Sequence, residues 1–337
     1  MKKNNYKTLL TAVVFCAVLA ACSDIERSSD DRAITFSAVS DPMTKGYVQG
    51  ETMDDTPFGG LHGGSAAAPR ALFLTAWLYT QPGGEEEYFR NEPFFKNANG
   101  ETSADDGYNL WHHNPPLYWP MGGRMDFLAY SASAPFAEEA LMWSYGNSTD
   151  RLAISVGADR TQDDIMFACA LNRSCSSSGN VPLRFYHAQA WLEFILIADA
   201  STSGSITVDR IELRDIYTSG MLTVEHPFGT AQGSWSFRSQ QRRDTPVDDS
   251  YGVYGTAVTV SPKYCDMLIP EQDMKNIVLY YSLDGSDAEL VYEWQAPGSM
   301  WEMGKKYIYE ISFSPNGISI LPLVRLWNYG GETEIEL

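Results

Sequence analysis

The stretch VPLRFYHAQAWLEFILIA, residues 181–198, is the longest apolar run of the chain outside its first 21 residues. Its apolar and polar side chains alternate, which is the pattern of a β-strand with one buried face. The apolar residues are odd-numbered in the first part and even-numbered in the second: Leu183 and Phe185, then Ala190, Leu192, Phe194 and Leu196. Because side chains in a strand alternate with a period of two, one flat strand cannot bury both sets on the same face. We therefore expect an irregularity, in its simplest form a β-bulge, at His187 or Ala188.

Short alternating segments also recur on both sides of this stretch, between clusters of Gly, Pro, Asn, Asp and Ser, and long helical patterns are hard to find. This arrangement is typical of β-sandwiches. The clearest expected strands cover residues 34–38, 72–78, 125–129, 206–213, 277–281, 306–313 and 318–326. We expect a short helical turn within residues 135–142, and loops at residues 46–69 and 239–250. The fold class that follows is all-β.

The polar run CSSSGN, residues 175–180, is the best candidate for a domain boundary, because it is rich in turn-forming residues. It predicts an N-terminal domain over residues 46–178 and a C-terminal domain over residues 179–337. Each domain would have a length typical of a single folding unit.

The first 45 residues have a different character from the rest. Lysines precede an apolar run that ends at Ala21 and is too short to cross a bilayer, which needs about 20 residues, so residues 1–21 are expected to be a signal peptide. The sequence LAAC, residues 19–22, resembles a bacterial lipobox, which predicts cleavage before Cys22 and acylation of that cysteine. Acyl chains would anchor the protein to a membrane. Residues 22–45 would then form a lipidated tether and the first strand.

Composition excludes several functions. The net charge of −19 repels phosphate groups, so we expect no nucleic-acid partner. At 44% hydrophobic and 13% aromatic residues, the chain can fill hydrophobic cores.

Beyond residue 22 the cysteines of the chain are Cys169, Cys175 and Cys265. This odd number excludes a complete disulfide framework, and either a Cys169–Cys175 bond or free thiols would fit.

Residues that could carry catalysis do not form a recognisable set. His112 and His113 would point to opposite faces of a strand, which is unsuited to holding one metal ion. His187 lies in the apolar strand, where a hydrogen-bonded core histidine is expected rather than a general base. No catalytic or nucleotide-binding fingerprint is present. We therefore expect no enzymatic activity, no metal and no other cofactor.

The nine tryptophans leave one alternative open. Exposed tryptophan side chains stack on sugar rings, so a glycan-binding surface protein is a second hypothesis. Most of these residues fall within or at the ends of expected strands, where packing in a core or at a sheet edge is the simpler interpretation.

A series of short motifs, in a fixed order, resembles the fimbrillin family, whose members form the pili of Gram-negative anaerobes. The motifs are ITFSA (34–38), TKG (44–46), YWP (118–120), FLAY (127–130), QDDIM (162–166), LRFYH (183–187), IEL (211–213), TSG (218–220), GSW (233–235), LIPEQ (268–272) and WEMGKKYIY (301–309). The resemblance implies two tandem transthyretin-like antiparallel β-sandwich domains. It also implies export as a lipoprotein, display at the outer membrane and assembly into a fimbrium.

The resemblance further implies assembly by donor-strand exchange. In polymerising members a surface protease cuts after an Arg or Lys that follows the first strand, and the groove this leaves accepts a strand from another subunit. Such a groove would offer unpaired backbone groups and apolar pockets to the incoming strand. A head-to-tail contact that does not close on itself then builds a filament.

The residues that match these roles lie at the two ends of the chain. The removable strand would contain Ile34, Phe36 and Ala38, and the donor strand would contain Thr333, Ile335 and Leu337. Cleavage is expected after Lys45, which an arginine-specific protease would not cut, or after Arg32, which would leave the strand in place.

The expected partners are other pilus subunits, the outer membrane through the lipid anchor, and a ligand on a host or bacterial surface. The alternative is a surface lipoprotein that binds glycans or host proteins without polymerising.

Overall fold

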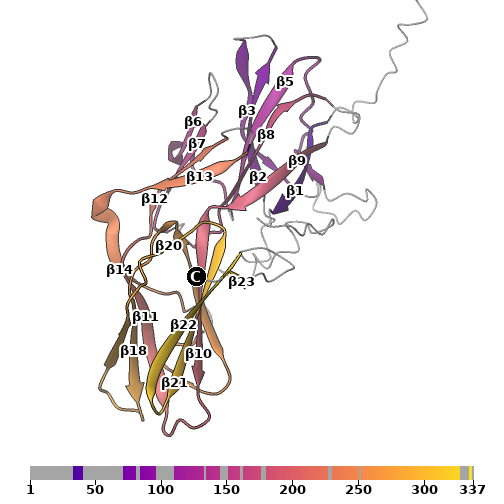
Figure 1. Ribbon diagram of the computed structural model, residues 1–337. Helices are drawn as coiled ribbons and strands as arrows, with labels where there is room; N and C mark the ends of the chain where they lie inside the picture. Colours follow the sequence, from indigo (N-terminus) through magenta and orange to yellow (C-terminus); the bar gives the residue numbers. More distant parts are fainter. Residues whose placement is uncertain are drawn as a thin grey trace, which may run out of the picture.

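A computed structural model describes residues 33–40, 71–80, 84–95, 110–132, 134–144, 151–159, 162–175, 180–226, 230–249, 252–326 and 334–335. The described residues are almost entirely in strands, turns and short 3₁₀ segments, so the all-β prediction is confirmed. None of the described helices is long and apolar enough to cross a membrane. Figure 1 shows the sheets in two groups, an upper group and a lower group, arranged end to end.

The larger sheet of the upper group has seven strands. In spatial order they are β3 (Glu85–Phe94), β2 (Ala71–Tyr79), β5 (Arg124–Ala132), β8 (Met166–Arg173), β9 (Asn180–His187), β1 (Thr35–Ser40) and β4 (Leu110–His112). Its two ends meet, because Phe95, which follows β3, and His112 of β4 exchange two backbone hydrogen bonds of 2.8 Å. The sheet therefore curls around its own hydrophobic core.

A four-stranded sheet covers the outside of this curled sheet. Its strands are β13 (Gln232–Ser236), β12 (Gly220–Glu225), β7 (Arg151–Val156) and β6 (Leu141–Ser144). A second core lies between the two sheets and contains Phe73, Trp77, Leu128, Ile154 and Leu222. Strand β2 is consequently buried on both faces, since Leu72 and Leu74 belong to the inner core while Phe73 and Trp77 belong to the outer one.

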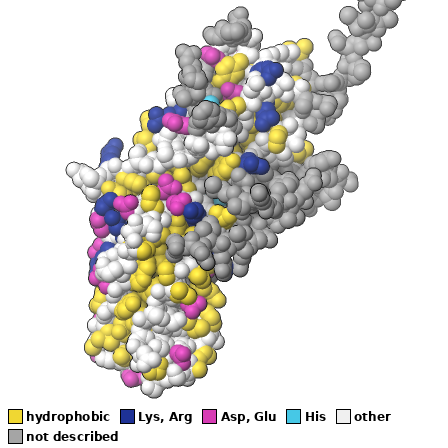
Figure 2. Space-filling view, viewed as in Figure 1, with side chains coloured by type: hydrophobic (Ala, Val, Ile, Leu, Met, Phe, Trp, Pro, Cys, Tyr) yellow, Lys and Arg dark blue, Asp and Glu magenta, His cyan; other side chains and the backbone are white. Residues whose placement is uncertain are grey.

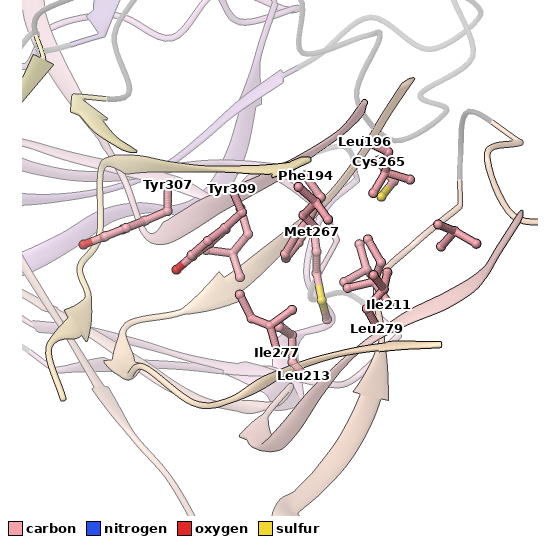
Figure 3. Close-up of a cluster of buried hydrophobic side chains, with 14 of the residues drawn as sticks. Phe194, Leu196, Ile211, Leu213, Cys265, Met267, Ile277, Leu279, Tyr307 and Tyr309 are labelled. Atoms are coloured by element: carbon pink, nitrogen blue, oxygen red, sulfur yellow. The ribbon is translucent and has the colours of Figure 1, made fainter. Parts of the chain in front are cut away.

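The lower group contains two five-stranded sheets that enclose a third core. One is made of β16 (Lys263–Pro270), β10 (Gln189–Ala198), β21 (Lys305–Ser314), β22 (Gly317–Leu326) and β23 (Glu334–Ile335); the other of β14 (Arg242–Pro246), β11 (Ile206–Tyr217), β18 (Ile277–Leu283), β19 (Leu290–Trp294) and β15 (Thr256–Val258). A short pair, β17 (Gln272–Asp273) and β20 (Met300–Trp301), completes the group. Figure 3 shows side chains of this core, with Phe194 and Tyr309 from one sheet opposite Ile211, Ile277 and Leu279 from the other.

The irregularity expected in residues 181–198 lies at Ala188, but it is a break between two strands rather than a β-bulge. Strand β9 places Leu183 and Phe185 in the core of the upper group, and β10 places Leu192 and Phe194 in the core of the lower group. The buried positions change from odd-numbered to even-numbered residues because the two strands contribute to different cores.

One further expectation needs correction. Residues 239–250 were expected to be a loop, but β14 pairs with β11 in this segment, because its backbone completes the lower sheet. Most strand pairs of the described residues are antiparallel, whereas β1 runs parallel to β9 and β10 runs parallel to β21. Parallel neighbours need long connections, and these pairs are joined by large parts of the chain. The helical turn expected in residues 135–142 is a short 3₁₀ segment, Glu138–Ala140, and residues 46–69 lie outside the described part.

The expected boundary at residue 178 falls between β8 and β9, which pair with each other at Met166 and His187. Strands β12 and β13 also lie in the upper group, although they follow β11 of the lower group. The chain therefore passes between the groups at several points along its length. The division into residues 46–178 and 179–337 as folding units stays a prediction.

Candidate functional site

Strand β1 occupies an interior position of the curled sheet. It pairs in parallel with β9 from Thr35↔Asn180 to Ser40↔Phe185, and antiparallel with β4 through Thr35, Phe36 and Ser37. Just before the strand, the backbone N–H of Ile34 donates to the carbonyl of Leu117 over 2.7 Å. Both edges of β1 are therefore engaged, although it comes from the N-terminal end of the chain (Figure 1).

The side chains of β1 fill the centre of the upper core. Phe36 is fully buried, and its ring meets Phe94 at 4.9 Å and Phe127 at 5.2 Å, both edge to face. Ile34 is 1% exposed and belongs to the same core. Burying an aromatic side chain of this size is among the largest single contributions to a core. Two residues of the predicted removable strand, Ile34 and Phe36, therefore lie in this core, while the removal of the strand stays a prediction.

Polar groups beside these side chains are less well satisfied. Among the described residues, the buried Thr35 Oγ1 of β1 and the Asn180 Oδ1 opposite it on β9 have no hydrogen-bond partner. A buried polar group without a partner costs about 1–3 kcal/mol. The apolar side chains of β1 therefore stabilise its position in the sheet, while the unpartnered Thr35 and Asn180 oxygens destabilise it.

Several predicted site residues cannot be placed. Cys22, Arg32 and Lys45 lie outside the described residues, as do Thr333 and Leu337. The backbone of Ala38 pairs with Leu183, but its side chain is likewise outside the described part. Lipidation at Cys22 and cleavage after Lys45 or Arg32 remain predictions, as do the roles of Ala38, Thr333 and Leu337.

The C-terminal strand β23 is placed only as a short backbone pair. Ile335 lies opposite Val324 and Glu334 lies opposite Arg325, so β23 forms the edge of its sheet. Figure 1 places it at the end of β22 that faces the upper group.

Two of the histidines singled out in the sequence contact neighbouring carboxylates. The Nδ1 atom of buried His187 lies 2.9 Å from the carboxylate of Asp164, as expected for a hydrogen-bonded core histidine. His113 contacts Glu92 at 3.0 Å. Within the described ranges, no group of His, Cys, Asp and Glu could hold a metal ion, and no disulfide joins Cys169 to Cys175.

The tryptophans of the described residues are used for packing. Four are nearly fully buried, namely Trp77, Trp111, Trp119 and Trp301, and none of the others described is exposed. This placement agrees with the packing interpretation.

Many motif residues singled out in the sequence meet where the two groups of sheets join. The Gln162 side chain donates to the carbonyl of Leu268 and accepts from its N–H, both at 2.9 Å. Gln272 binds the backbone N–H and carbonyl of Tyr217 in the same way, at 2.8 and 2.9 Å. An amide side chain can replace a neighbouring strand in this manner because it carries both a donor and an acceptor.

The motif glycines allow close contact at this junction. A Cβ on Gly220 would lie 2.8 Å from the ring of Phe237, and one on Gly233 would lie 2.7 Å from the ring of Phe167. Trp235, which follows Gly233, donates its Nε1–H to the carbonyl of Ala188 over 2.6 Å. Sequence reasoning found these motifs but not their common location, since their residues are far apart along the chain.

Charged side chains on the outside of the lower group are largely paired. Figure 2 shows acidic and basic side chains mixed along the left edge of the molecule, at the height of β11 and β14. In this region Arg214 pairs with Asp244, and Arg242 pairs with Asp215 at 3.0 Å. No strongly basic surface results in this region, which suits the acidic composition.

Comparison with solved structures identifies proteins with the same fold. A fimbrial protein from Bacteroides vulgatus has a TM-score of 0.57 and 14% sequence identity, and the match covers 88% of this chain and 100% of that chain. A proposed cell adhesion protein from Bacteroides uniformis has a TM-score of 0.53 and 15% identity, with 90% and 100% covered. Comparison with curated protein sequences finds no match.

The fold thus defines an all-β protein of the architecture found in fimbrial and adhesion proteins. The sequence model of a family described as fimbrillin-like matches residues 73–324. The chain belongs to the fimbrillin-like family.

Proposed function

We propose that this protein is a structural and adhesive subunit of a surface pilus, without enzymatic activity, assembled by exchange of its first strand. The observation that carries the proposal is the position of β1. This strand lies between β9 and β4 and places Phe36 at the centre of a closed core. Removing β1 would open the curled sheet along one strand and uncover Phe94 and Phe127. An incoming strand would restore the backbone pairs and refill the core.

The proposal includes the route to the surface. Cys22 would carry the lipid anchor that holds the precursor at the outer membrane. Cleavage after Lys45 would release the anchor and β1 together, whereas cleavage after Arg32 would leave β1 in its seat. The arrangement in two tandem transthyretin-like sandwiches is part of the same proposal.

The donor would be the C-terminal segment that contains Thr333, Ile335 and Leu337. Its described part, Glu334–Ile335, pairs only with the end of β22, at Val324 and Arg325. Because β23 is the edge strand of its sheet, the segment could leave the sheet for another subunit without separating other strands.

The test starts from the lipoprotein purified from membranes in detergent. Treatment with a lysine-specific protease should cut after Lys45, release the anchored strand and give filaments in electron micrographs. A Lys45→Ala variant should remain uncut and monomeric, and deletion of residues 332–337 should permit cleavage without filaments. Mass spectrometry of the native surface species would establish acylation at Cys22 and the processed N-terminus. Clean cleavage after Lys45 that yields only monomers would refute the proposal.

A further inference from the structure

A cavity opens on the outer face of the lower group, beside the edge strand β16. Its volume is about 450 Å³, and it is lined by Glu193, Gly252, Val253, Lys263, Tyr264 and Asp266. Ligand pockets in proteins generally measure roughly 300–1,000 Å³. Glu193 and Asp266 are direct cross-strand neighbours on β10 and β16, and they face away from the core that contains Phe194 and Cys265.

The charged side chains of this cavity are held by neighbours. Lys306 donates to Glu193 over 2.7 Å while its ammonium group lies 3.7 Å from the centre of the Trp191 ring. The indole N–H of Trp191 in turn donates to the carboxylate of Asp266 over 3.3 Å. On the other side, Lys263 donates to the hydroxyl of Thr256.

The backbone of the cavity wall at Val253 and Tyr254 is also held. The carboxylate of Asp249 accepts hydrogen bonds from the backbone N–H groups of Val253 and Tyr254. Gly252 has a φ of +63°, which suits glycine, and it lets the loop turn at the cavity wall. A site whose walls are held before a ligand arrives loses less conformational entropy when it binds one.

The charges around the cavity restrict the chemistry of a ligand. An anion would face the carboxyl groups of Glu193 and Asp266, with Asp248 beside them, and a cation would face the ammonium groups of Lys263 and Lys306, so a neutral ligand fits best. An apolar ligand is disfavoured because it would cover charged groups. A neutral polyhydroxylated ligand can donate to the carboxylates and accept from Lys263. The ring of Tyr264, which is 45% exposed, offers an apolar surface beside them.

We propose that this cavity binds a neutral saccharide, with Glu193 and Asp266 accepting hydrogen bonds from sugar hydroxyls and Tyr264 packing against the C–H face of the ring. The site lies at the edge of the lower group and uses no residue of β1 or of β23. Its binding is therefore independent of strand exchange, and a failure of one would leave the other standing.

The test is a titration of the full chain with methyl glycosides of glucose, galactose, mannose, fucose and N-acetylglucosamine, followed by NMR chemical shifts. At least one glycoside is expected to bind, with shifts at the cavity residues. At pH 8, above the raised pKa of Asp266, Tyr264→Ala and Asp266→Asn should each weaken that binding at least tenfold. The matched controls Tyr88→Ala and Asp287→Asn replace an exposed tyrosine and an exposed aspartate outside the cavity, and they should bind like the unaltered chain.

Two further arms identify the ligand. An array of immobilised glycans distinguishes the end of a glycan chain from a free sugar, and both results support the proposal. Titration with spermidine tests an amine instead. The proposal is overturned if no glycoside and no glycan binds, if only spermidine binds, or if sugar binding survives both cavity variants while their spectra show an intact fold.

Discussion

Phe36 is the side chain that most firmly fixes the first strand in its sheet. It is fully buried, and it touches Phe94 and Phe127 from two other strands, so its loss would leave a cavity that several elements share. The cost of such a cavity depends on how far the surroundings can collapse, and rings held edge to face by several strands can move little.

Replacing Phe36 by alanine should lower the free energy of unfolding of the uncleaved chain by about 3–5 kcal/mol. Urea unfolding followed by tryptophan fluorescence measures this, because Trp111 and Trp119 lie in the same core. Ser37→Ala, a change at the neighbouring half-buried position, should cost less than about 1 kcal/mol. Equal losses for the two variants would mean that the aromatic contacts of Phe36 do not hold the strand.

Asp266 should make stability depend on pH. Burial raises the pKa of Asp266 to about 7 from an ordinary 3.8; the nearby carboxylates of Glu193 and Asp248 add to this effect, while Trp191 and Lys306 oppose it. Between about pH 4 and pH 7 the unfolded chain loses this proton while the folded chain keeps it. The folded state is therefore destabilised as pH rises through this window.

Asp266→Asn replaces the titrating carboxyl group with an amide that does not titrate. The unfolding free energy of the unaltered chain minus that of the variant should therefore fall as pH rises from 4 to 7. The expected change is on the order of a few kcal/mol. Urea unfolding at pH 4.5, 6 and 7.5 measures it. A difference that stays constant with pH would contradict the raised pKa.

At the scale of elements, the edge of β16 is covered by single contacts rather than by a further strand. Gln162 binds both backbone groups of Leu268, and Asp248 forms an isolated β-bridge with Asp266. Open edges invite pairing with other chains, and these contacts cover part of this one. They also join the loop before β8 to the lower group.

Gln162→Leu should remove both hydrogen bonds to Leu268 and lower the free energy of unfolding by roughly 1–3 kcal/mol. Hydrogen exchange at the Leu268 amide should become faster, which mass spectrometry of the corresponding peptide would detect. Gln162→Glu should have an intermediate effect, because a carboxylate can accept from the N–H but cannot donate to the carbonyl. Replacing the exposed Gln232 by alanine serves as a control and should leave exchange at Leu268 unchanged. Unchanged exchange at Leu268 in Gln162→Leu would refute the prediction.

At the scale of the whole molecule, a stack of rings links the two groups of sheets. Trp235 and Phe237 lie with their rings 6.3 Å apart at 3°, and Phe237 and Tyr217 lie 4.2 Å apart at 6°. The guanidinium group of Arg242 lies 4.7 Å from the centre of the Tyr217 ring and continues the stack. Contacts of this kind contribute about 0.5–1.5 kcal/mol each beyond the area they bury.

Tyr217→Ala should therefore weaken the coupling between the two groups of sheets. Calorimetry of the unaltered chain should give one main unfolding transition, and that of the variant should give a broader or divided one. The exposed Tyr88→Ala should leave the transition unchanged in shape. A single sharp transition in Tyr217→Ala would mean that the stack does not couple the groups.

The sequence by itself predicted the all-β class and most strand positions, because alternation with a period of two is a local property of each segment. It also predicted that Ile34 and Phe36 share one face and that His187 is a core residue. The motifs placed the chain in its family although their residues are scattered from Ile34 to Tyr309.

Only the tertiary structure determined what these segments are paired with. The change of parity at Ala188 reflects a strand that leaves one core and enters another, and no local pattern distinguishes this from a β-bulge. The closure of the upper sheet at Phe95 and His112, the meeting of Gln162 with Leu268 and the cavity beside Asp266 all join residues far apart in the chain. Long-range contacts of this kind depend on how whole sheets stack, which a single sequence does not encode locally.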